Sequence, residues 1–122
     1  MTPRRVVVAD DVEVVRALVR IVLEESGQFV VVAEATTGRE AIALTEQHHP
    51  DIVLLDLAMP QMSGMEALPH ILKASPTTRV VVLSGFREDV AAVEAIERGA
   101  TGYLDKRQDL GDIASRLIAL LE

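Results

Sequence analysis

The chain has 122 residues, a net charge of −7 and no cysteine, with 49% hydrophobic and 25% charged residues. This length and composition are typical of one globular domain, and the missing thiols exclude zinc–thiolate sites, iron–sulfur clusters and cysteine nucleophiles. The acidic balance and an aromatic content of 2% argue against direct contact with nucleic acid, which needs cations for phosphates and rings for bases. Because the apolar runs are far shorter than the roughly 20 residues of a membrane span and no signal peptide is recognisable, we expect a cytoplasmic protein without membrane contact.

Short β-branched runs recur along the chain, beginning with Val6-Val7-Val8. Continuous apolar runs, in contrast to strict alternation, predict strands that are covered on both faces, as in a parallel sheet. The predicted strands are Arg4 to Ala9, Gln28 to Glu34, Asp51 to Leu55, Arg79 to Leu83 and, more weakly, Thr101 to Leu104.

The segments between these strands have the length and periodicity of crossover helices. Asp11 to Glu25 carries an apolar stripe at helical spacing, which predicts the first helix. Thr37 with Glu40, and Ser63 with Glu66, have the spacing of a capping box, in which a hydroxyl and a carboxylate bond each other's backbone N–H. The second and third helices are therefore predicted to begin near residues 38 and 64.

The last two predicted helices complete an alternating pattern. Glu88 to Arg98 is predicted as the fourth helix, ending at Gly99, and Asp109 as the start of the fifth. Pro69 falls inside the third helix and removes a backbone donor, so we expect a kink or a late helix start there. Five strands alternating with five helices predict a doubly wound α/β domain.

Polar side chains follow four of the predicted strands: Asp10 and Asp11, Asp56, Ser84 and Lys106. In an open α/β sheet, ligands bind outside the carboxyl ends of the strands, so these groups should gather at one edge. Each also has a local explanation, since aspartates cap helices or form Asx-turns and serine and lysine are common in loops. Taken together they favour a site, because an acid at the end of an apolar strand is unfavourable unless it is paired.

The expected chemistry of this edge is phosphoryl transfer. Clustered carboxylates repel one another, and Mg²⁺ relieves the repulsion while keeping room for water and a phosphoryl oxygen. Asp56 is the natural nucleophile, since carboxylates form aspartyl-phosphate intermediates. Lys106 and the Ser84 hydroxyl would neutralise and bind the phosphoryl oxygens.

Four segments at these positions match one known family in order and spacing. They are Val6-Val7-Val8-Ala9-Asp10-Asp11, Asp51 to Pro60 with Ser63-Gly64, Val81-Val82-Leu83-Ser84-Gly85, and Gly99 to Lys106. Over nearly its whole length the chain resembles the receiver domain of bacterial two-component response regulators. The resemblance implies a flavodoxin-like parallel sheet of order 2-1-3-4-5 with five helices over residues 1–122, and any output domain would lie beyond residue 122.

The resemblance also implies a role for each acid. Asp56 would be phosphorylated by a sensor histidine kinase. Asp11 and Asp56 would bind Mg²⁺ directly, Asp10 would bind it through water, and the backbone carbonyl of Ala58 would add an oxygen ligand. Because Ala58 has no polar side chain to orient water, the lifetime of the phosphorylated state does not follow from the sequence.

By the same resemblance, Ser84 and Lys106 would bind the phosphoryl group. Tyr103 would be the aromatic switch residue, turning inward when Ser84 moves; the alternative is a half-buried strand tyrosine. Many receivers have proline after the lysine, often with a cis peptide bond, but Arg107 stands here. This argues against a cis bond, which is unfavourable by ~3 kcal/mol without proline.

The acyl phosphate on Asp56 is expected to act as a switch and not as the product of a catalysed reaction. The resemblance implies that the surface of the fourth helix, fifth strand and fifth helix would change and control transcription through a separate or C-terminal DNA-binding domain. Ala58 and Lys106-Arg107 resemble the branch of the family that carries a helix-turn-helix output domain. The wide apolar stripe of the fifth helix suggests a second packing surface, for a homodimer or an output domain. Six charged residues of this region are expected to be mostly a solvated face: Arg87, Glu88, Asp89, Glu94, Arg98 and Arg116. The alternative function is a protein-binding adaptor on a receiver scaffold that works without phosphorylation.

Overall fold

Five parallel strands form the central layer of the structure, a computed structural model that describes residues 2–85 and 89–122. The strand order is β2-β1-β3-β4-β5, which confirms the predicted doubly wound fold. Each strand lies within one residue of its predicted bounds. The strands are β1 (Arg4–Ala9), β2 (Phe29–Ala35), β3 (Ile52–Asp56), β4 (Arg79–Ser84) and β5 (Gly102–Asp105).

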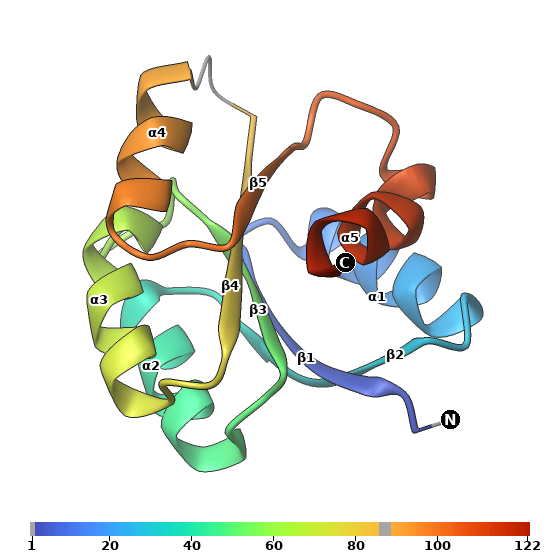
Figure 1. Ribbon diagram of the computed structural model, residues 1–122, viewed down its shortest axis with the longest axis horizontal. Coiled ribbons are helices and arrows are strands. Elements are labelled where there is room, and N and C mark those ends of the chain that lie inside the picture. Colours follow the sequence, from blue (N-terminus) through green and yellow to red (C-terminus); the bar gives the residue numbers. More distant parts are fainter. Residues whose placement is uncertain (1, 86–88) are drawn as a thin grey trace.

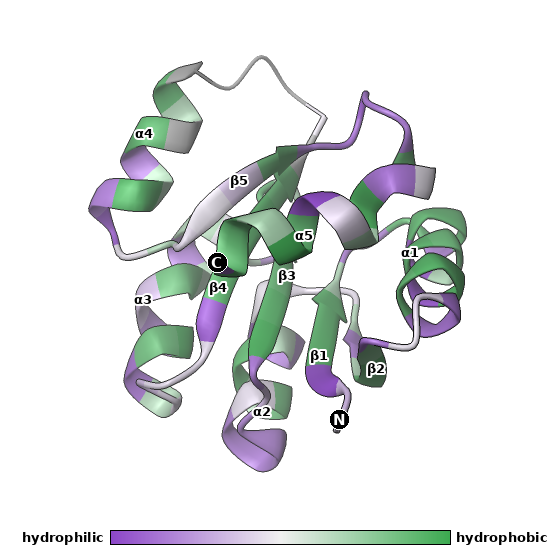
Figure 2. Ribbon diagram, turned by 45° about the vertical axis from the view of Figure 1, so that its right-hand side comes forward, coloured by the Kyte–Doolittle hydropathy of each residue, from purple (hydrophilic) through white to green (hydrophobic). Residues whose placement is uncertain are grey.

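Helices cover both faces of the sheet (Figure 1). One face carries α1 (Glu13–Glu25) and α5 (Ile113–Leu121), with a short 3₁₀ helix, η1 (Leu110–Asp112), before α5. The other carries α2 (Gly38–His48), α3 (Gly64–Ala74) and α4 (Asp89–Glu97). Each face has its own apolar core, and β1, β3 and β4 are hydrophobic over most of their length because they contribute to both cores (Figure 2). No helix in the described ranges is long and apolar enough to cross a membrane.

Two helix starts follow the capping chemistry of the sequence. At α3 the full capping box forms: the Ser63 hydroxyl accepts from the Glu66 N–H at 3.2 Å, and the Glu66 carboxylate accepts from the Ser63 N–H at 3.3 Å. At α2 the Thr37 hydroxyl accepts from the Glu40 N–H at 3.1 Å, and the Glu40 carboxylate accepts from the N–H and the hydroxyl of Thr36. Both helices begin at the predicted positions, which fixes the loops after β2 and β3.

Other helix ends differ from the prediction. Helix α1 begins after Val12 with no side-chain cap, so Asp11 does not serve as the helix cap. Asp109 caps the 3₁₀ helix, and α5 begins only at Ile113. Pro69 lies within α3 without delaying its start at Gly64, so the predicted late start is wrong. The predicted first residue of α4, Glu88, lies outside the described residues.

The wide apolar surface of α5 is used mainly within the domain. Ala114 and Leu121 are 8% and 9% exposed, and Ile118 and Leu120 pack against the same core. The helix lies against both α1 and the sheet, and these intramolecular contacts account for apolar residues on more than one stripe. Contact of α5 with a second copy or an output domain stays a prediction.

A buried hydroxyl network joins the loops at the amino ends of β3 and β4. The Thr78 hydroxyl, on a residue that is 4% exposed, donates to the Pro50 carbonyl at 2.7 Å and lies 2.7 Å from the Ser75 hydroxyl. We expect Thr78→Val to lower the free energy of unfolding by about 1–3 kcal/mol, because it leaves a buried carbonyl without a donor. Urea denaturation measures this, with exposed Thr77→Val as the control. Equal stabilities of the two variants would show that the network contributes nothing.

Candidate functional site

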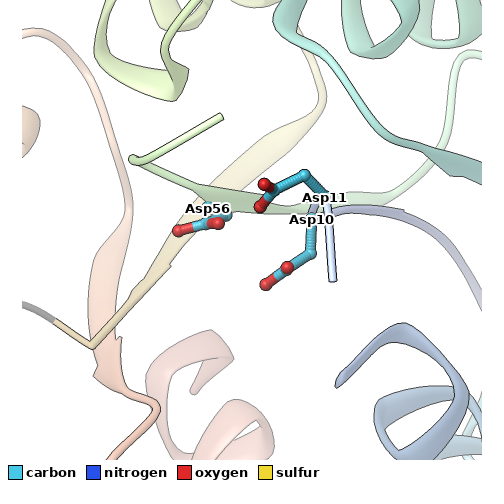
Figure 3. Close-up of side chains that lie close together, drawn as sticks. All are labelled: Asp10, Asp11 and Asp56. Carbon is cyan, nitrogen blue, oxygen red and sulfur yellow. The ribbon is translucent and has the colours of Figure 1, made fainter. Parts of the chain in front are cut away.

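Three aspartates meet at the carboxyl ends of β1 and β3. These strands are parallel neighbours, and the register pairs Ala9 with Leu55, so the next residue of each strand, Asp10 and Asp56, reaches the same edge. Asp11 follows directly. One carboxylate oxygen from each of the three lies within 4.8 Å of the others, and Figure 3 shows the three side chains gathered around a common space. The structure therefore brings together the acids that the sequence predicted.

Two of these carboxylates are buried and held by backbone N–H groups. Asp10 is 0% exposed and Asp56 is 2% exposed. Asp10 Oδ1 accepts from the Val12 N–H at 2.8 Å, and Asp56 Oδ1 accepts from the Ala58 N–H at 3.2 Å. The Asx-turn considered as a local explanation for Asp56 is present, but it uses only Oδ1; the other oxygen, Oδ2, faces Lys106.

Lys106 completes the cluster from the end of β5. Its Nζ lies 2.6 Å from Asp10 Oδ2 and 3.2 Å from Asp56 Oδ2. Within the described part of the chain, Asp10 Oδ2 is buried and makes no hydrogen bond that would supplement this ion pair. One ammonium thus faces two buried carboxylates, and the exposed carboxylate of Asp11 lies close to both, which leaves an excess of negative charge in the cluster.

The pKa values of the buried groups reflect this imbalance. Burial, followed by the charge of Asp10, raises the pKa of Asp56 from 3.8 to about 6, against the opposing effects of the Ala58 N–H and Lys106. Burial disfavours the charged form of Lys106, but the hydrogen bond to Asp10 and the attraction of both carboxylates outweigh it and raise the pKa of Lys106. Asp56 is therefore more basic than an ordinary aspartate while remaining mostly ionised at pH 7.

The donor set fits a hard divalent cation. All three acids offer oxygen, their oxygens are close enough to share one ion, and the buried Asp10 Oδ2 lacks a full set of partners. Mg²⁺ keeps several waters and binds through one or two carboxylates, and the exposure of Asp11 leaves a side open to solvent. The three oxygen donors and the open side thus suit Mg²⁺ better than an ion that protein ligands surround completely.

The remaining predicted site residues lie near this edge. Ser84 is the last residue of β4, and its side chain lies outside the described part of the structure. Tyr103 is half-buried on β5 and packs against the core beneath α2, α3 and α4. Ala58 is exposed in the loop after β3. Among the described residues, which include Lys106 and Arg107, no peptide bond is cis.

Two residues next to the site have contacts that no local pattern reveals. A Cβ on Gly64 would lie 2.0 Å from the Asp56 carbonyl oxygen, so the start of α3 is packed directly on the backbone of the acid. Arg116 of α5 reaches back to the loop that carries Lys106 and is half-buried, so it does not belong to the expected solvated face. Gly64 lies in the matching motif, but nothing in the sequence near Arg116 marks its contacts.

The other charged residues of that face are only partly described. Arg98, directly after α4, and Glu94 form an exposed ion pair at 2.8 Å, which agrees with a solvated face. Arg87, Glu88 and the side chain of Asp89 lie outside the described residues.

A doubly wound parallel sheet with aspartates and a lysine gathered at its carboxyl edge places the chain among the α/β domains whose ligand site lies at the carboxyl ends of parallel strands. Comparison with known proteins identifies the family. The response regulator receiver domain matches residues 6–118, and the chain belongs to this family. Receiver domains are signalling domains of two-component systems and not classical enzymes.

Individual relatives agree with this assignment. The chain is 40% identical over 102 residues to the transcriptional regulatory protein YdfI of Bacillus subtilis, covering 84% of this chain and 47% of that protein. It is 34% identical over 103 residues to the chemotaxis protein CheY of Thermotoga maritima, covering 84% and 85%. The receiver domain of NarL from Mycobacterium tuberculosis superimposes with a TM-score of 0.90 at 34% identity, over 98% of this chain and 96% of that one. The chain spans about half the length of the Bacillus regulators that it matches.

Proposed function

We propose that Asp56 accepts a phosphoryl group from a sensor histidine kinase and that this acyl phosphate switches the domain between two output states. The observation that carries the proposal is the position of Asp56: it is buried beside Asp10 and Asp11, with Lys106 Nζ 3.2 Å from its Oδ2. A structural role for Asp56 would not explain why two further carboxylates lie beside a buried one, since burying charge is unfavourable. Membership in the receiver family supports the same role.

The chain's own residues supply the nucleophile and its orientation. An Asp56 oxygen bonds to phosphorus as the phosphorus–nitrogen bond of the donor breaks, and the electron pair leaves with the nitrogen. The Ala58 N–H holds the plane of the Asp56 carboxylate, and burial keeps this carboxylate basic. The Lys106 ammonium, already facing two carboxylates, balances the charge of the incoming phosphoryl oxygens, with the Ser84 hydroxyl as a further donor.

The cation would be held by the acids at the edge of the sheet. In this proposal Asp11 and Asp56 bind Mg²⁺ directly, Asp10 binds through water, and the Ala58 carbonyl adds a ligand. When bound, Mg²⁺ neutralises negative charge on the carboxylates and on the phosphoryl group. The excess of carboxylate over ammonium charge supports this assignment.

The output surface that we propose is formed by α4, β5 and α5. Ser84 and Tyr103, on neighbouring strands, would transmit phosphorylation to this surface. Helix α4 exposes three large apolar residues, Val90 at 80%, Val93 at 56% and Ile96 at 53%, which supports contact with a partner or a second copy of the chain. Because relatives such as YdfI are transcriptional regulators and about twice as long, the controlled output would be a DNA-binding domain outside these 122 residues.

Phosphorylation with a small donor tests the proposal without the kinase. With Mg²⁺ and phosphoramidate, the intact mass of the wild type should increase by one phosphate, because the nucleophile and its neutralising groups all lie in this chain. Asp56→Asn should gain none. Asp51→Asn, an exposed aspartate just before the same strand, should be phosphorylated like the wild type.

A wild-type protein that gains no mass would favour the phosphorylation-independent adaptor. The same phosphorylated samples also test the homodimer by size-exclusion chromatography. An elution volume that does not change on phosphorylation would exclude a phosphorylation-dependent dimer.

A further inference from the structure

We infer that Arg116 is a positioning residue for phosphoryl transfer: it fixes the loop that carries Lys106, and through that loop the ammonium that faces Asp10 and Asp56. The inference rests on the proposed function and adds a residue on α5, outside the cluster of acids. It concerns the four residues between the end of β5 and the start of η1, residues 106–109.

The guanidinium of Arg116 bonds the loop at both ends. Its Nη1 donates to the Gln108 side-chain oxygen at 2.7 Å and, at 3.4 Å, to the Asp105 carbonyl. Its Nη2 donates to the Asp109 carbonyl at 2.9 Å. One planar group therefore connects the residue before Lys106 with two residues after it.

The loop also has internal bonds that act on the same short segment. The Arg107 N–H and Nε donate to Asp105 Oδ1 at 2.8 and 3.0 Å, and the Arg107 Nη2 donates to Asp105 Oδ2 at 2.7 Å. The Gln108 N–H donates to the Asp105 carbonyl at 3.2 Å. Since Asp105 and Arg107 flank Lys106, these bonds give the loop its shape, and Arg116 joins that shape to α5.

Helix α5 is a rigid base for this attachment. Ile113 and Leu117, on either side of Arg116 in the helix, are both 0% exposed and belong to the core beneath α1 and α5. The Arg116 Nε is buried and has no hydrogen-bond partner within the described ranges, so the contacts to the loop determine where the guanidinium lies. A packed helix thus holds the arginine, and the arginine holds the loop.

The position of the loop matters because the lysine side chain is flexible. Lys106 has four rotatable side-chain bonds, and its Nζ must stay within reach of Asp10 Oδ2 at 2.6 Å and Asp56 Oδ2 at 3.2 Å. A small displacement of its Cα would remove the ammonium from one or both oxygens. Displacements of about 1 Å in a reacting group can reduce a rate about 100-fold.

The hydrogen bonds of Arg116 indicate that it holds the loop by its donor geometry and not by its charge alone. The three acceptors of the guanidinium are the Asp105 carbonyl, the Gln108 side-chain oxygen and the Asp109 carbonyl, so the guanidinium acts as a fork of donors. Lysine at this position keeps the charge but has a single ammonium, which cannot reproduce the planar fork. Arg116→Lys should therefore recover only part of the function that Arg116→Gln loses.

Two measurements on the same variants test the inference. The first is the single-turnover rate of phosphorylation by phosphoramidate with Mg²⁺, which should fall about tenfold or more in Arg116→Gln. The second is the NMR signal of lysine labelled with ¹³C at Cε, which reports two sites, because Lys73 and Lys106 are the only lysines in the sequence. Arg116→Gln should shift the Lys106 signal and leave the Lys73 signal in place.

The matched control is Arg98→Gln, which removes an exposed ion pair with Glu94 at 2.8 Å and should change neither measurement. An unchanged Lys106 signal in folded Arg116→Gln overturns the inference, whatever the rate, and so does an unchanged rate. If Arg116→Gln does not fold, Arg116→Lys replaces it: the label then reports a third lysine at position 116, and we expect a smaller loss of rate, a shifted Lys106 signal and an unchanged Lys73 signal. A wild type that is not phosphorylated refutes the proposed function, while the lysine signals still show whether Arg116 positions Lys106.

Discussion

Asp56→Asn should raise the free energy of unfolding of the metal-free protein at pH 7 by about 1–3 kcal/mol. The Asp56 carboxylate is buried beside Asp10, and its ionised form is disfavoured, with a pKa of about 6 against an ordinary value of 3.8. This difference corresponds to about 3 kcal/mol if the whole shift is realised. Asparagine keeps an oxygen for the Ala58 N–H, which bonds Oδ1 at 3.2 Å, and removes the charge.

The effect should depend on pH in a defined direction. Because the pKa of Asp56 is higher in the folded protein than in the unfolded chain, the folded state binds more protons between pH 3.8 and about 6. The contribution of Asp56 to stability therefore decreases as the pH rises through this window, and the destabilisation is complete above it. The difference between Asp56→Asn and wild type should be small near pH 4 and reach its full value by pH 7.

Urea denaturation in EDTA, followed by circular dichroism from pH 4 to pH 8, measures this difference. The exposed Asp112→Asn, whose side chain makes no capping bond at the start of α5, controls for the substitution itself and should change stability by less than about 0.5 kcal/mol. Adding Mg²⁺ should stabilise the wild type, since the proposed site would bind the ion only in the folded state, and should stabilise Asp56→Asn much less. A difference between Asp56→Asn and wild type that is constant over the whole pH range would show that Asp56 is not destabilised by its surroundings.

The fold was largely predictable because its elements depend on local signals. Continuous valine runs specify strands that are buried on both faces, and Ser63 with Glu66 specifies where α3 begins. The errors lie where two local signals compete. Asp109 is a good cap, but the residues after it first form a 3₁₀ turn, and Pro69 lies in a helix that is held by its buried face despite the missing donor.

The sequence allowed the acids and the lysine of the site to be grouped, but it did not predict the distances between them. Parallel strands bring residues at their carboxyl ends to one edge, so Asp10, Asp56 and Lys106 could be grouped from the sequence. Their distances could not, and Lys106 lies closer to Asp10 than to Asp56. Arg116 was placed on a solvated face because its acceptors are carbonyl and amide oxygens of a loop that only the tertiary fold brings near.

Gly64→Ala should be the most disruptive small substitution near the site. The added Cβ would lie 2.0 Å from the Asp56 carbonyl oxygen and 2.8 Å from its carbonyl carbon. These are backbone atoms of a buried strand end, so the clash cannot be relieved by rotating a side chain. The Gly64 N–H also donates to the Leu57 carbonyl at 3.1 Å, and this bond holds α3 against the same segment. We expect a loss of at least about 3 kcal/mol in the free energy of unfolding, at the upper end of overpacking effects.

The same substitution should reduce phosphorylation beyond its effect on stability, because relief of the clash must move either the start of α3 or the backbone of Asp56. The single-turnover rate with phosphoramidate, measured at a temperature where the variant is folded, should fall about tenfold or more. Gly85→Ala is the matched control: it also lies beside the site, but among the described residues its Cβ would meet the Lys106 Cβ at an ordinary 3.9 Å. If the two alanine variants have equal stabilities and equal rates, the close packing of α3 on the end of β3 does not hold Asp56 in place.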